Sequence, residues 1–387
     1  MKIGIDKLGF YTSDLYVDMK KLALARNEDP KKYLVGLGQE KMAVIPPTQD
    51  PVTLAANAAD RILTPEDKRD ITYVLFATES GIDNSKAAAI YAANLLGLGQ
   101  HVRTAEIKQA CYGATAAIHL AHGYLALHPD EKVLILASDI ARYGLHTKGE
   151  PTQGGGAVAI LMSINPHLLA IENDSGVYTE DIMDFWRPLG RNTALVDGHY
   201  STEEYLKFLK KSFNQLRQKS GFRLDDFQAF VFHLPYSKLG KKAADQMLTM
   251  GETEQAADFV MAFEISRQYG KVVGNLYTGS LYLALLSLLE NDSDLRPGNR
   301  VGLFSYGSGA IGDFYSAIVQ PWFTSHIYKK EHQEMLANRR EVSVEEYEKL
   351  FEAAVLDDND IELDISEDPA KFVFAGVKDH KRIYKEK

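Results

Sequence analysis

Short apolar runs alternate with longer stretches rich in Ala and Leu through most of the chain, and this alternation predicts an α/β fold. In the first half, the short apolar runs at residues 71–77 and 132–137 predict buried strands. Residues 85–96 have the spacing of an amphipathic helix, and residues 111–126 form a helix with almost no charge. Residues 154–161 then combine a glycine turn with a strand.

The second half repeats these parts in the same order. Residues 227–232 predict a buried strand, residues 274–286 a turn of small residues that enters an apolar helix, and residues 300–305 another strand. We therefore expect an internal duplication, with one half at residues 1–166 and the other at residues 167–387.

The duplication places four candidate residues at equivalent positions of the two halves. Glu79 follows a buried strand and Cys111 begins a helix, while His233 and Asn275 hold the corresponding places in the second half. Strand ends and helix N-termini would then meet at one central cleft, which is where α/β sheets bind ligands.

Three segments depart from the repeat. Residues 343–351 carry a capping-box signature that predicts a helix, and an acidic surface loop at residues 357–368 leads to a strand at residues 372–377. Residues 166–205 lack clear periodicity and are expected to be an ordered excursion over the cleft.

Composition is that of a globular protein, with 45% hydrophobic and 25% charged residues. A single cysteine excludes an intramolecular disulfide framework and a four-cysteine metal site, so we expect no metal. The start of the chain lacks a signal-peptide pattern, and no apolar run is long enough to span a membrane. The expected compartment is the cytoplasm.

The net charge of −10 argues against nucleic acid as a partner, because phosphate binding needs a basic surface. Anionic small molecules remain possible ligands of local basic clusters. The best cluster contains Lys238 and Lys242 just after an apolar strand, and a weaker one follows Asp29. Such clusters are also common on solvated helix faces, so the charge pattern leaves both interpretations open.

The lone cysteine, Cys111, is a candidate nucleophile. It stands where a polar stretch gives way to a helix of small residues, and the positive end of a helix dipole favours thiolate over thiol. The alternative is an inert buried side chain.

Its expected neighbours fit acyl chemistry. A desolvated Glu79 could abstract a proton α to a carbonyl, and His233 with Asn275 could bind or protonate a carbonyl oxygen. Backbone N–H groups of Cys111 and of the turn at Gly307 would form an oxyanion hole. Alternatively, Glu79 is a solvated loop acid, His233 a core histidine and Asn275 a turn residue.

The sequence around each of these residues resembles the motifs of the 3-hydroxy-3-methylglutaryl-CoA (HMG-CoA) synthase family, and the likeness covers nearly the whole chain. The motifs are Ala-Thr-Glu-Ser at 77–80, Lys-Gln-Ala-Cys-Tyr-Gly-Ala-Thr at 108–115, Gly-Glu-Pro-Thr-Gln-Gly at 149–154, Asp-Phe-Trp-Arg-Pro at 184–188, Phe-His-Leu-Pro-Tyr-Ser-Lys at 232–238, Gly-Asn-Leu-Tyr-Thr-Gly-Ser at 274–280 and Phe-Ser-Tyr-Gly-Ser-Gly at 304–309. The compact length resembles the bacterial branch, which implies the duplicated, five-layered αβαβα fold of the thiolase superfamily.

The resemblance implies a two-stage reaction without a cofactor. Acetyl-CoA would acetylate Cys111, Glu79 would remove a methyl proton, and the enolate would attack acetoacetyl-CoA held by His233 and Asn275. Water would then release HMG-CoA for the mevalonate route. The resemblance also implies a homodimer packed through the sheet edges.

Further positions take their roles from the same resemblance. The implied substrate-binding residues are Asp29, Tyr143, Thr152, Ser201, Lys238, Lys242, Asn275 and Ser308. The implied supporting residues are Asp139, Asp184 and Gly307.

Two alternatives remain at this point. A ketoacyl-acyl-carrier-protein synthase also uses Cys, His and Asn, but it generates its carbanion by decarboxylation and needs no base such as Glu79. A non-catalytic acyl-binding or scaffold subunit is disfavoured because Cys111, Glu79 and His233 are all present.

Overall fold

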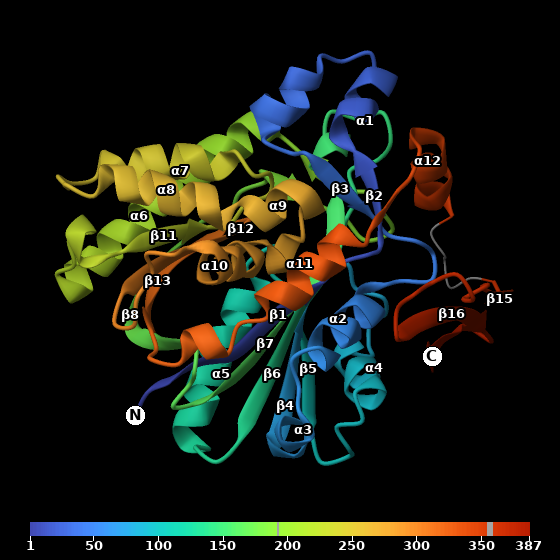
Figure 1. Cartoon of the computed structure of the whole chain (residues 1–387), viewed down its shortest axis with the longest axis horizontal. Coiled ribbons are helices and arrows are strands. Elements are labelled where there is room, and N and C mark those ends of the chain that lie inside the picture. The colour runs from blue at the N-terminus through green and yellow to red at the C-terminus, as the bar shows by residue number, and fades with distance from the viewer. Residues whose placement is uncertain (192, 354–358) are drawn as a thin grey trace.

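The computed structural model describes residues 1–191, 193–353 and 359–387 (Figure 1). The strands are β1 (Ile3–Tyr11), β2 (Leu15–Asp18), β3 (Lys41–Val44), β4 (Ile71–Ala77), β5 (Arg103–Ile107), β6 (Lys132–Ala141), β7 (Gly154–Ile164), β8 (Leu169–Thr179), β9 (Phe185–Trp186), β10 (Leu195–Val196), β11 (Ala229–Phe232), β12 (Arg300–Gly307), β13 (Ile311–Val319), β14 (Arg340–Glu341), β15 (Ile361–Glu362), β16 (Phe372–Lys378) and β17 (Lys381–Glu386). The α-helices are α1 (Met19–Ala25), α2 (Pro51–Asp60), α3 (Pro65–Asp70), α4 (Ala88–Leu95), α5 (Gly113–Leu127), α6 (Gly198–Ser220), α7 (Leu239–Leu248), α8 (Ala256–Ser266), α9 (Gln268–Val273), α10 (Ser280–Asn291), α11 (Lys329–Ala337) and α12 (Val344–Glu352). Short helical turns are η1 (Lys32–Leu37, a π-helix), η2 (Glu150–Thr152), η3 (Leu224–Asp226), η4 (Tyr277–Gly279) and η5 (Phe323–Ser325).

The main sheet contains two copies of one strand pattern. Its order is β11-β12-β13-β8-β1-β7-β6-β4-β5. In the first half β4 pairs parallel with β6, then β6 with β7 and β7 with β1 pair antiparallel. In the second half β11, β12, β13 and β8 make the same parallel and antiparallel pairings in the same sequence. The expected duplication is thus visible in the topology, and β1 and β8 join the halves through two residue pairs.

Helices α5 and α10 lie between the two half-sheets. The Thr115 hydroxyl of α5 donates to Ser305 of β12 in the other half and lies 2.6 Å from the Tyr282 hydroxyl of α10. Helix α2 contacts the opposite face of the first half-sheet, where the Ser138 hydroxyl donates to the Pro51 carbonyl, and α6 lies against β8 and β13 of the second. The resulting order is helix, sheet, helices, sheet, helix, which confirms the expected αβαβα layering.

Small side chains allow α5 to occupy this middle layer. Ala114, Ala117 and Ala121 are fully buried, so strands of both halves approach the helix closely. Helix α2 begins sharply because the Asp50 carboxylate accepts from the backbone N–H of Thr53 in a capping box.

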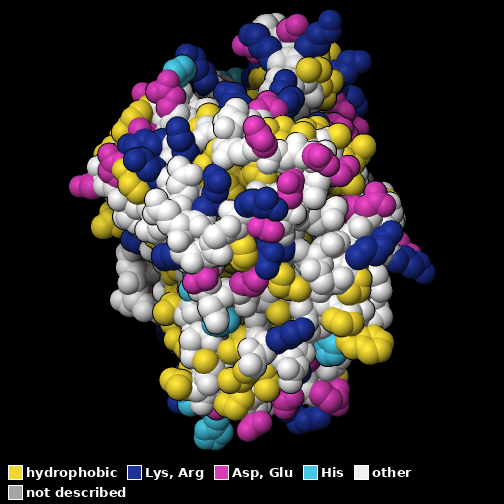
Figure 2. All heavy atoms as spheres, turned by 90° about the vertical axis from the view of Figure 1, so that its left-hand side faces the viewer, with side chains coloured by type: hydrophobic (Ala, Val, Ile, Leu, Met, Phe, Trp, Pro, Cys, Tyr) yellow, Lys and Arg dark blue, Asp and Glu magenta, His cyan; other side chains and the backbone are white. Residues whose placement is uncertain are grey.

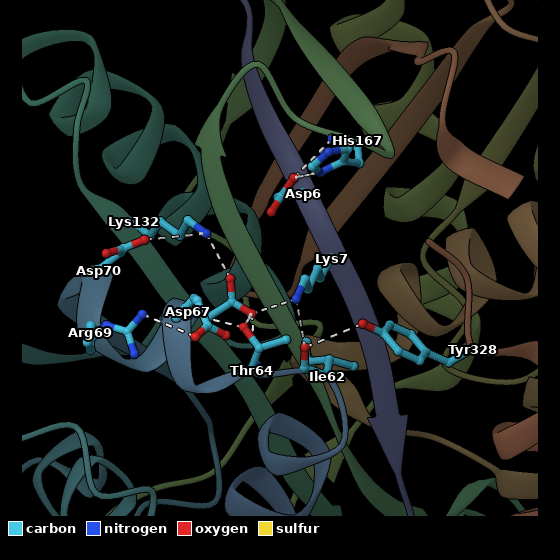
Figure 3. Close-up of polar contacts among 11 residues, drawn as sticks. Asp6, Lys7, Ile62, Thr64, Asp67, Arg69, Asp70, Lys132, His167 and Tyr328 are labelled. Carbon is cyan, nitrogen blue, oxygen red and sulfur yellow. Dashed lines mark hydrogen bonds and ion pairs between the residues drawn. The ribbon is translucent and has the colours of Figure 1, made fainter. Parts of the chain in front are cut away.

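A buried ion cluster ties β1 to its neighbours (Figure 3). Asp67 in the first turn of α3 accepts from Lys7 of β1 at 2.5 Å and from Lys132 of β6 at 2.8 Å. Burial opposes ionisation, but the hydrogen bonds from the two lysines outweigh it and lower the pKa of Asp67 to about 2. The cluster lies at the end of the sheet remote from Glu79.

Two smaller units stand beside the main body. Strands β2, β3 and β14 form a sheet that, with α1, η1 and α12, encloses its own hydrophobic cluster, and α1 projects at the top of Figure 1. Strands β15, β16 and β17 form a C-terminal sheet next to α2. On the face that carries α6 and α7, Lys and Arg side chains are mixed with Asp and Glu (Figure 2).

The structure corrects three sequence-based boundaries. Residues 166–205 are only partly an excursion, because they include the long internal strand β8 and the start of α6. The helix expected at residues 85–96 spans only Ala88–Leu95. The expected acidic loop at residues 357–368 contains β15, and its first two residues lie outside the described residues. Among the described helices, none is both long and apolar enough to cross a membrane.

Candidate active site

Cys111 lies just before α5, not within it. The helix begins at Gly113, so the expectation of a helix over residues 111–126 places its start two residues early. The preceding residue, Ala110, has a φ of 44°, a left-handed conformation that is uncommon for alanine. Backbone strain of this kind concentrates at functional sites, because it fixes the direction of a reactive side chain.

Gly307 holds the nucleophile segment in place from the other half of the molecule. A Cβ atom at this position would lie 2.6 Å from Cβ of Tyr112 and 2.7 Å from the Gln109 carbonyl oxygen. No side chain therefore fits at residue 307 without moving the residues on either side of Cys111. The Gln109 amide also donates to the Ser308 carbonyl at 3.3 Å.

The thiol of Cys111 donates a hydrogen bond to Oε1 of Glu79 at 3.1 Å. Burial first, and then the Glu79 charge, raise the pKa of Cys111 well above its usual value. The resting Cys111 is therefore a thiol and not the expected thiolate, with burial as the first cause and the Glu79 charge as the second. Burial and the nearby Asp139 raise the pKa of Glu79 to about 8, against the opposing effects of the thiol and Arg187.

Asp139 joins the two halves behind Glu79. Its fully buried Oδ1 accepts from the Thr78 hydroxyl, from the backbone N–H groups of Glu79 and Ser80, and from the Ser80 hydroxyl, all at 2.8–2.9 Å. Its Oδ2 accepts from the backbone N–H of Thr278 at 3.1 Å and from the Thr278 hydroxyl at 2.6 Å. One carboxylate thus fixes the loop that carries Glu79 and the turn that follows Asn275.

His233 follows β11 as Glu79 follows β4. Its backbone N–H donates to the Phe304 carbonyl of β12, and its carbonyl accepts from the Tyr205 hydroxyl. The imidazole is buried, with Nδ1 left without a hydrogen-bond partner in the described structure. Burial lowers the pKa of His233 to about 3, so the ring is neutral. Because the ring is neutral, we expect His233 to donate a hydrogen bond to a carbonyl oxygen and not to protonate it.

Asn275 precedes the second central helix, α10. Its side-chain oxygen accepts from the backbone N–H of Tyr277 and from the Ser280 hydroxyl, which fixes the amide orientation. The amide nitrogen, Nδ2, is buried and has no hydrogen-bond partner among the described residues. The Asn275 amide also lies near the Tyr143 hydroxyl, whose pKa it lowers, and its buried donor remains available to a ligand.

Three aromatic rings stand beside these groups. Tyr143, Phe185 and Tyr277 contact one another edge to face, with ring centroids 5.8–6.1 Å apart. The charges of Cys111 and Glu79, after burial, raise the pKa of Tyr143 above its usual range, which locates its hydroxyl close to the reactive pair. These rings give the site an apolar wall.

Gln153 is a positioning residue that the sequence reasoning missed. Its side-chain oxygen accepts from the backbone N–H groups of Tyr143 and Gly144, and its carbonyl accepts from the Asn275 N–H. Its side-chain amide nitrogen donates to the Tyr347 hydroxyl at 2.8 Å. No sequence signal marks this role, because only the fold brings these partners to Gln153. The preceding Thr152 lies in η2 and donates its hydroxyl to a backbone carbonyl within the same turn.

Asp184 anchors the loop after β12. It is fully buried and accepts from the Ser201 hydroxyl at 3.0 Å, from the Tyr306 hydroxyl at 2.8 Å and from the Gly309 backbone N–H at 2.9 Å. Ser201, implied as a substrate contact, is thus engaged with Asp184 at the start of α6.

The implied CoA residues lie on neighbouring elements. The Lys238 ammonium donates to the Val35 carbonyl at 2.9 Å, and its backbone N–H donates to the Leu37 carbonyl. This contact brings η1 and the exposed Asp29 just before it against the N-terminus of α7, which also presents the exposed Lys242. The structure therefore places Lys238 beside the segment that carries Asp29.

Comparisons with known proteins agree along the whole chain. The family model described as "Hydroxymethylglutaryl-coenzyme A synthase N terminal" matches residues 1–167, and its C-terminal counterpart matches residues 169–262 and 254–356. Hydroxymethylglutaryl-CoA synthase from Enterococcus faecalis is 47% identical over 386 residues, covering 100% of both chains. The Bacillus subtilis polyketide 3-hydroxy-3-methylglutaryl-ACP synthase PksG is 32% identical, covering 91% of this chain and 88% of its own.

Solved structures give the same result. A crystal structure of HMG-CoA synthase complexed with CoA has a TM-score of 0.96 at 43% identity, covering 100% of both chains. MvaS in complex with 3-hydroxy-3-methylglutaryl coenzyme A has a TM-score of 0.91 at 37% identity, covering 100% of this chain and 99% of its own. The duplicated fold, the paired Cys111 and Glu79, and these full-length matches agree: the chain belongs to the hydroxymethylglutaryl-CoA synthase family.

Proposed function

We propose that this protein condenses acetyl-CoA with acetoacetyl-CoA and water to give HMG-CoA and CoA through an acetyl-Cys111 intermediate. The observation that carries the proposal is the 3.1 Å contact between the Cys111 thiol and the Glu79 carboxylate. In the first stage Glu79 takes the thiol proton as the sulfur attacks the acetyl thioester, and CoA leaves with a proton.

In the second stage Glu79 serves as the base for carbon chemistry. Its carboxylate removes a methyl proton from acetyl-Cys111, and the enolate attacks the ketone carbon of acetoacetyl-CoA. The ketone oxygen becomes an alkoxide, and Glu79 or a group near it returns a proton to this oxygen, which leaves the hydroxyl of the product and an ionised Glu79. Partial desolvation suits this role, because a raised pKa makes the carboxylate a stronger base near neutral pH.

His233 and Asn275 are proposed to hold the oxygens of acetoacetyl-CoA. The support is their buried donor capacity: Asn275 Nδ2 has no partner within the described residues, and the neutral His233 ring can donate one hydrogen bond. Neutral donors polarise a ketone without consuming the base beside them.

The CoA portion is proposed to bind along α7 and η1. Lys238 and Lys242 supply positive charge for the phosphates, and Asp29 lies on the facing segment. The steps proposed for Cys111 and Glu79 consist of acyl transfer and proton transfer, so the proposal includes no cofactor. The proposed compartment is the cytoplasm.

We also propose a homodimer. Strand β5 is an edge of the main sheet, and α5 exposes Leu120 and Leu127 by 58% and 80%. A second copy could pair along β5 and cover these side chains. Sedimentation of the wild type and of Leu120→Lys tests this, since a shift to monomer is expected for the variant.

Intact-protein mass spectrometry after mixing with acetyl-CoA tests the central proposal. We expect one acetyl group per chain on Cys111, and neither this adduct nor HMG-CoA with Cys111→Ser. Normal turnover by Cys111→Ser would overturn the covalent route. A ketoacyl-acyl-carrier-protein synthase activity is disfavoured because the thiol is bonded to a carboxylate that a decarboxylating reaction does not need.

A further inference from the structure

A cavity of about 750 Å³ reaches Glu79 from a side of the molecule that does not carry the proposed CoA residues. Its lining includes the loop at residues 80–87, the loop at residues 187–191 and the first residues of α2. Phe374 and Arg382 of the C-terminal sheet close another wall.

The cavity is polar and extends to the surface of the single chain. Glu106 and Lys108 lie at the β5 edge along which a second copy is proposed to pair, so in the dimer water would enter from the side of residues 187–191. Charged side chains on its walls include Lys86, Lys108, Arg142, Arg187, Asp83 and Glu106. Leu189 on its rim is 89% exposed. A space of this size with charged walls holds water, because emptying it would leave those groups unsolvated.

The chemistry of the last step requires a second approach to the site. This argument rests on the proposed function. After condensation, the product is bound to Cys111 at one end and to CoA at the other, so the substrate passage along α7 and η1 is filled. Water must still reach the carbonyl carbon of the Cys111 thioester.

The geometry points to the cavity beside Glu79 as the route and reservoir of the hydrolytic water, and we propose this role for it. Water oxygen forms a bond to the thioester carbon as the carbon–sulfur bond to Cys111 breaks. Glu79 takes one proton from the water and returns one to the Cys111 sulfur, so a carboxylic acid and a thiol are formed.

Ile82 offers a way to test the route. It lines the cavity on the loop after Glu79, and its side chain is partly buried against the core. Ile82→Trp should narrow the cavity without touching Cys111 or the α7 side. Ile90→Trp is the matched control, because Ile90 is 45% exposed on α4 and is not part of the cavity lining. A second variant, Ala87→Trp, narrows the cavity from the start of α4.

The experiment follows Cys111 adducts by mass spectrometry under turnover with both substrates. Ile82→Trp and Ala87→Trp should acetylate and condense as the wild type does, but turnover should fall about tenfold, with covalent HMG-CoA accumulating on Cys111. The control should show neither change. Wild-type turnover without this adduct in both cavity variants would overturn the route, and so would loss of acetylation confined to them. Failure of the wild type to acetylate would instead overturn the proposed function.

Discussion

Cys111 and Glu79 follow the neighbouring parallel strands β5 and β4, and the thiol donates a hydrogen bond to the carboxylate, with Sγ 3.1 Å from Oε1. Each group shifts the other: the Glu79 charge raises the pKa of the thiol, while the thiol hydrogen bond lowers the pKa of Glu79. When Cys111 is acetylated this hydrogen bond is lost. The pKa of Glu79 should then rise further, so the carboxylate becomes a stronger base for the step in which it must remove a methyl proton.

Replacing Glu79 by glutamine should damage condensation more than acetylation. The amide keeps a hydrogen-bond acceptor for the thiol but cannot take a proton. We expect HMG-CoA formation to fall by about 10²–10⁴-fold, the range for loss of a general base, while acetyl-Cys111 still forms, more slowly. Parallel measurement of acetyl-Cys111 and HMG-CoA separates the two steps.

Glu180→Gln is the control for this change, because Glu180 is an exposed carboxylate paired with Lys207. It should leave both steps intact. Undiminished condensation in Glu79→Gln would return Glu79 to the alternative of a loop acid without a catalytic role.

The raised pKa of Glu79 predicts a pH dependence of both rate and stability. The rate of condensation should increase as pH rises to about 8 and beyond, because the Glu79 pKa is about 8 in the resting site and rises further when Cys111 is acetylated. The folded state binds this proton more tightly than the unfolded state, whose glutamate has the ordinary pKa of 4.5. This contribution to stability is present below about 4.5 and is lost as pH rises through about 8.

Glu79→Gln should therefore become more stable relative to the wild type as pH increases across that interval. Urea unfolding of both proteins at several pH values measures the difference. A difference that is independent of pH would show that Glu79 has its ordinary pKa in the folded protein.

His233→Ala should separate binding of the second substrate from acetylation. The ring is neutral and does not contact the thiol through any hydrogen bond among the described residues. We expect acetyl-Cys111 to form at a largely preserved rate, while condensation fails and KM for acetoacetyl-CoA rises. Loss at the acetylation step would instead indicate a Cys–His nucleophile pair, as in the ketoacyl synthases.

Asp139→Asn should weaken the connection between the halves. The asparagine oxygen can replace Oδ1, but its NH2 group would face the Thr278 donors in place of Oδ2. We expect the free energy of unfolding to fall by about 1–3 kcal/mol, measured by urea titration. Asp225→Asn, at an exposed position bonded to Thr253, is the control and should be near neutral. Equal stability of the two variants would contradict the bridging role of Asp139.

The sequence predicts the parts of this molecule whose signal is local. Strands β4 and β12 are mainly apolar runs, and the small residues after Cys111 and Asn275 predict the two central helices. Strand β8 could not be predicted in this way, because it contains the charged residue Glu172, which pairs with Arg300 of β12. Its polar character is explained by a partner far away in the sequence.

The protonation state of Cys111 shows the same limit within the site. A position at a helix start predicts a thiolate, and the prediction is wrong because burial of the sulfur, and next the charge of Glu79 on another element, raise the pKa of the thiol. The roles of Gln153 and Arg187 could not be predicted from the sequence for a similar reason. Their roles depend on backbone groups and on a cavity that exist only in the folded chain.

The bridge made by Asp139 has a consequence for the history of the two halves. After a duplication, equivalent positions are free to diverge, and here the first half has kept the ionisable residues Glu79 and Cys111 while the second offers the neutral amide of Asn275 and a neutral imidazole at His233. Asp139 of the first half fixes the Thr278 turn of the second. A change that made the two halves alike again at this position would therefore remove the hydrogen bonds that connect them. The two halves now carry different parts of one site, and each needs the other to hold its part in place.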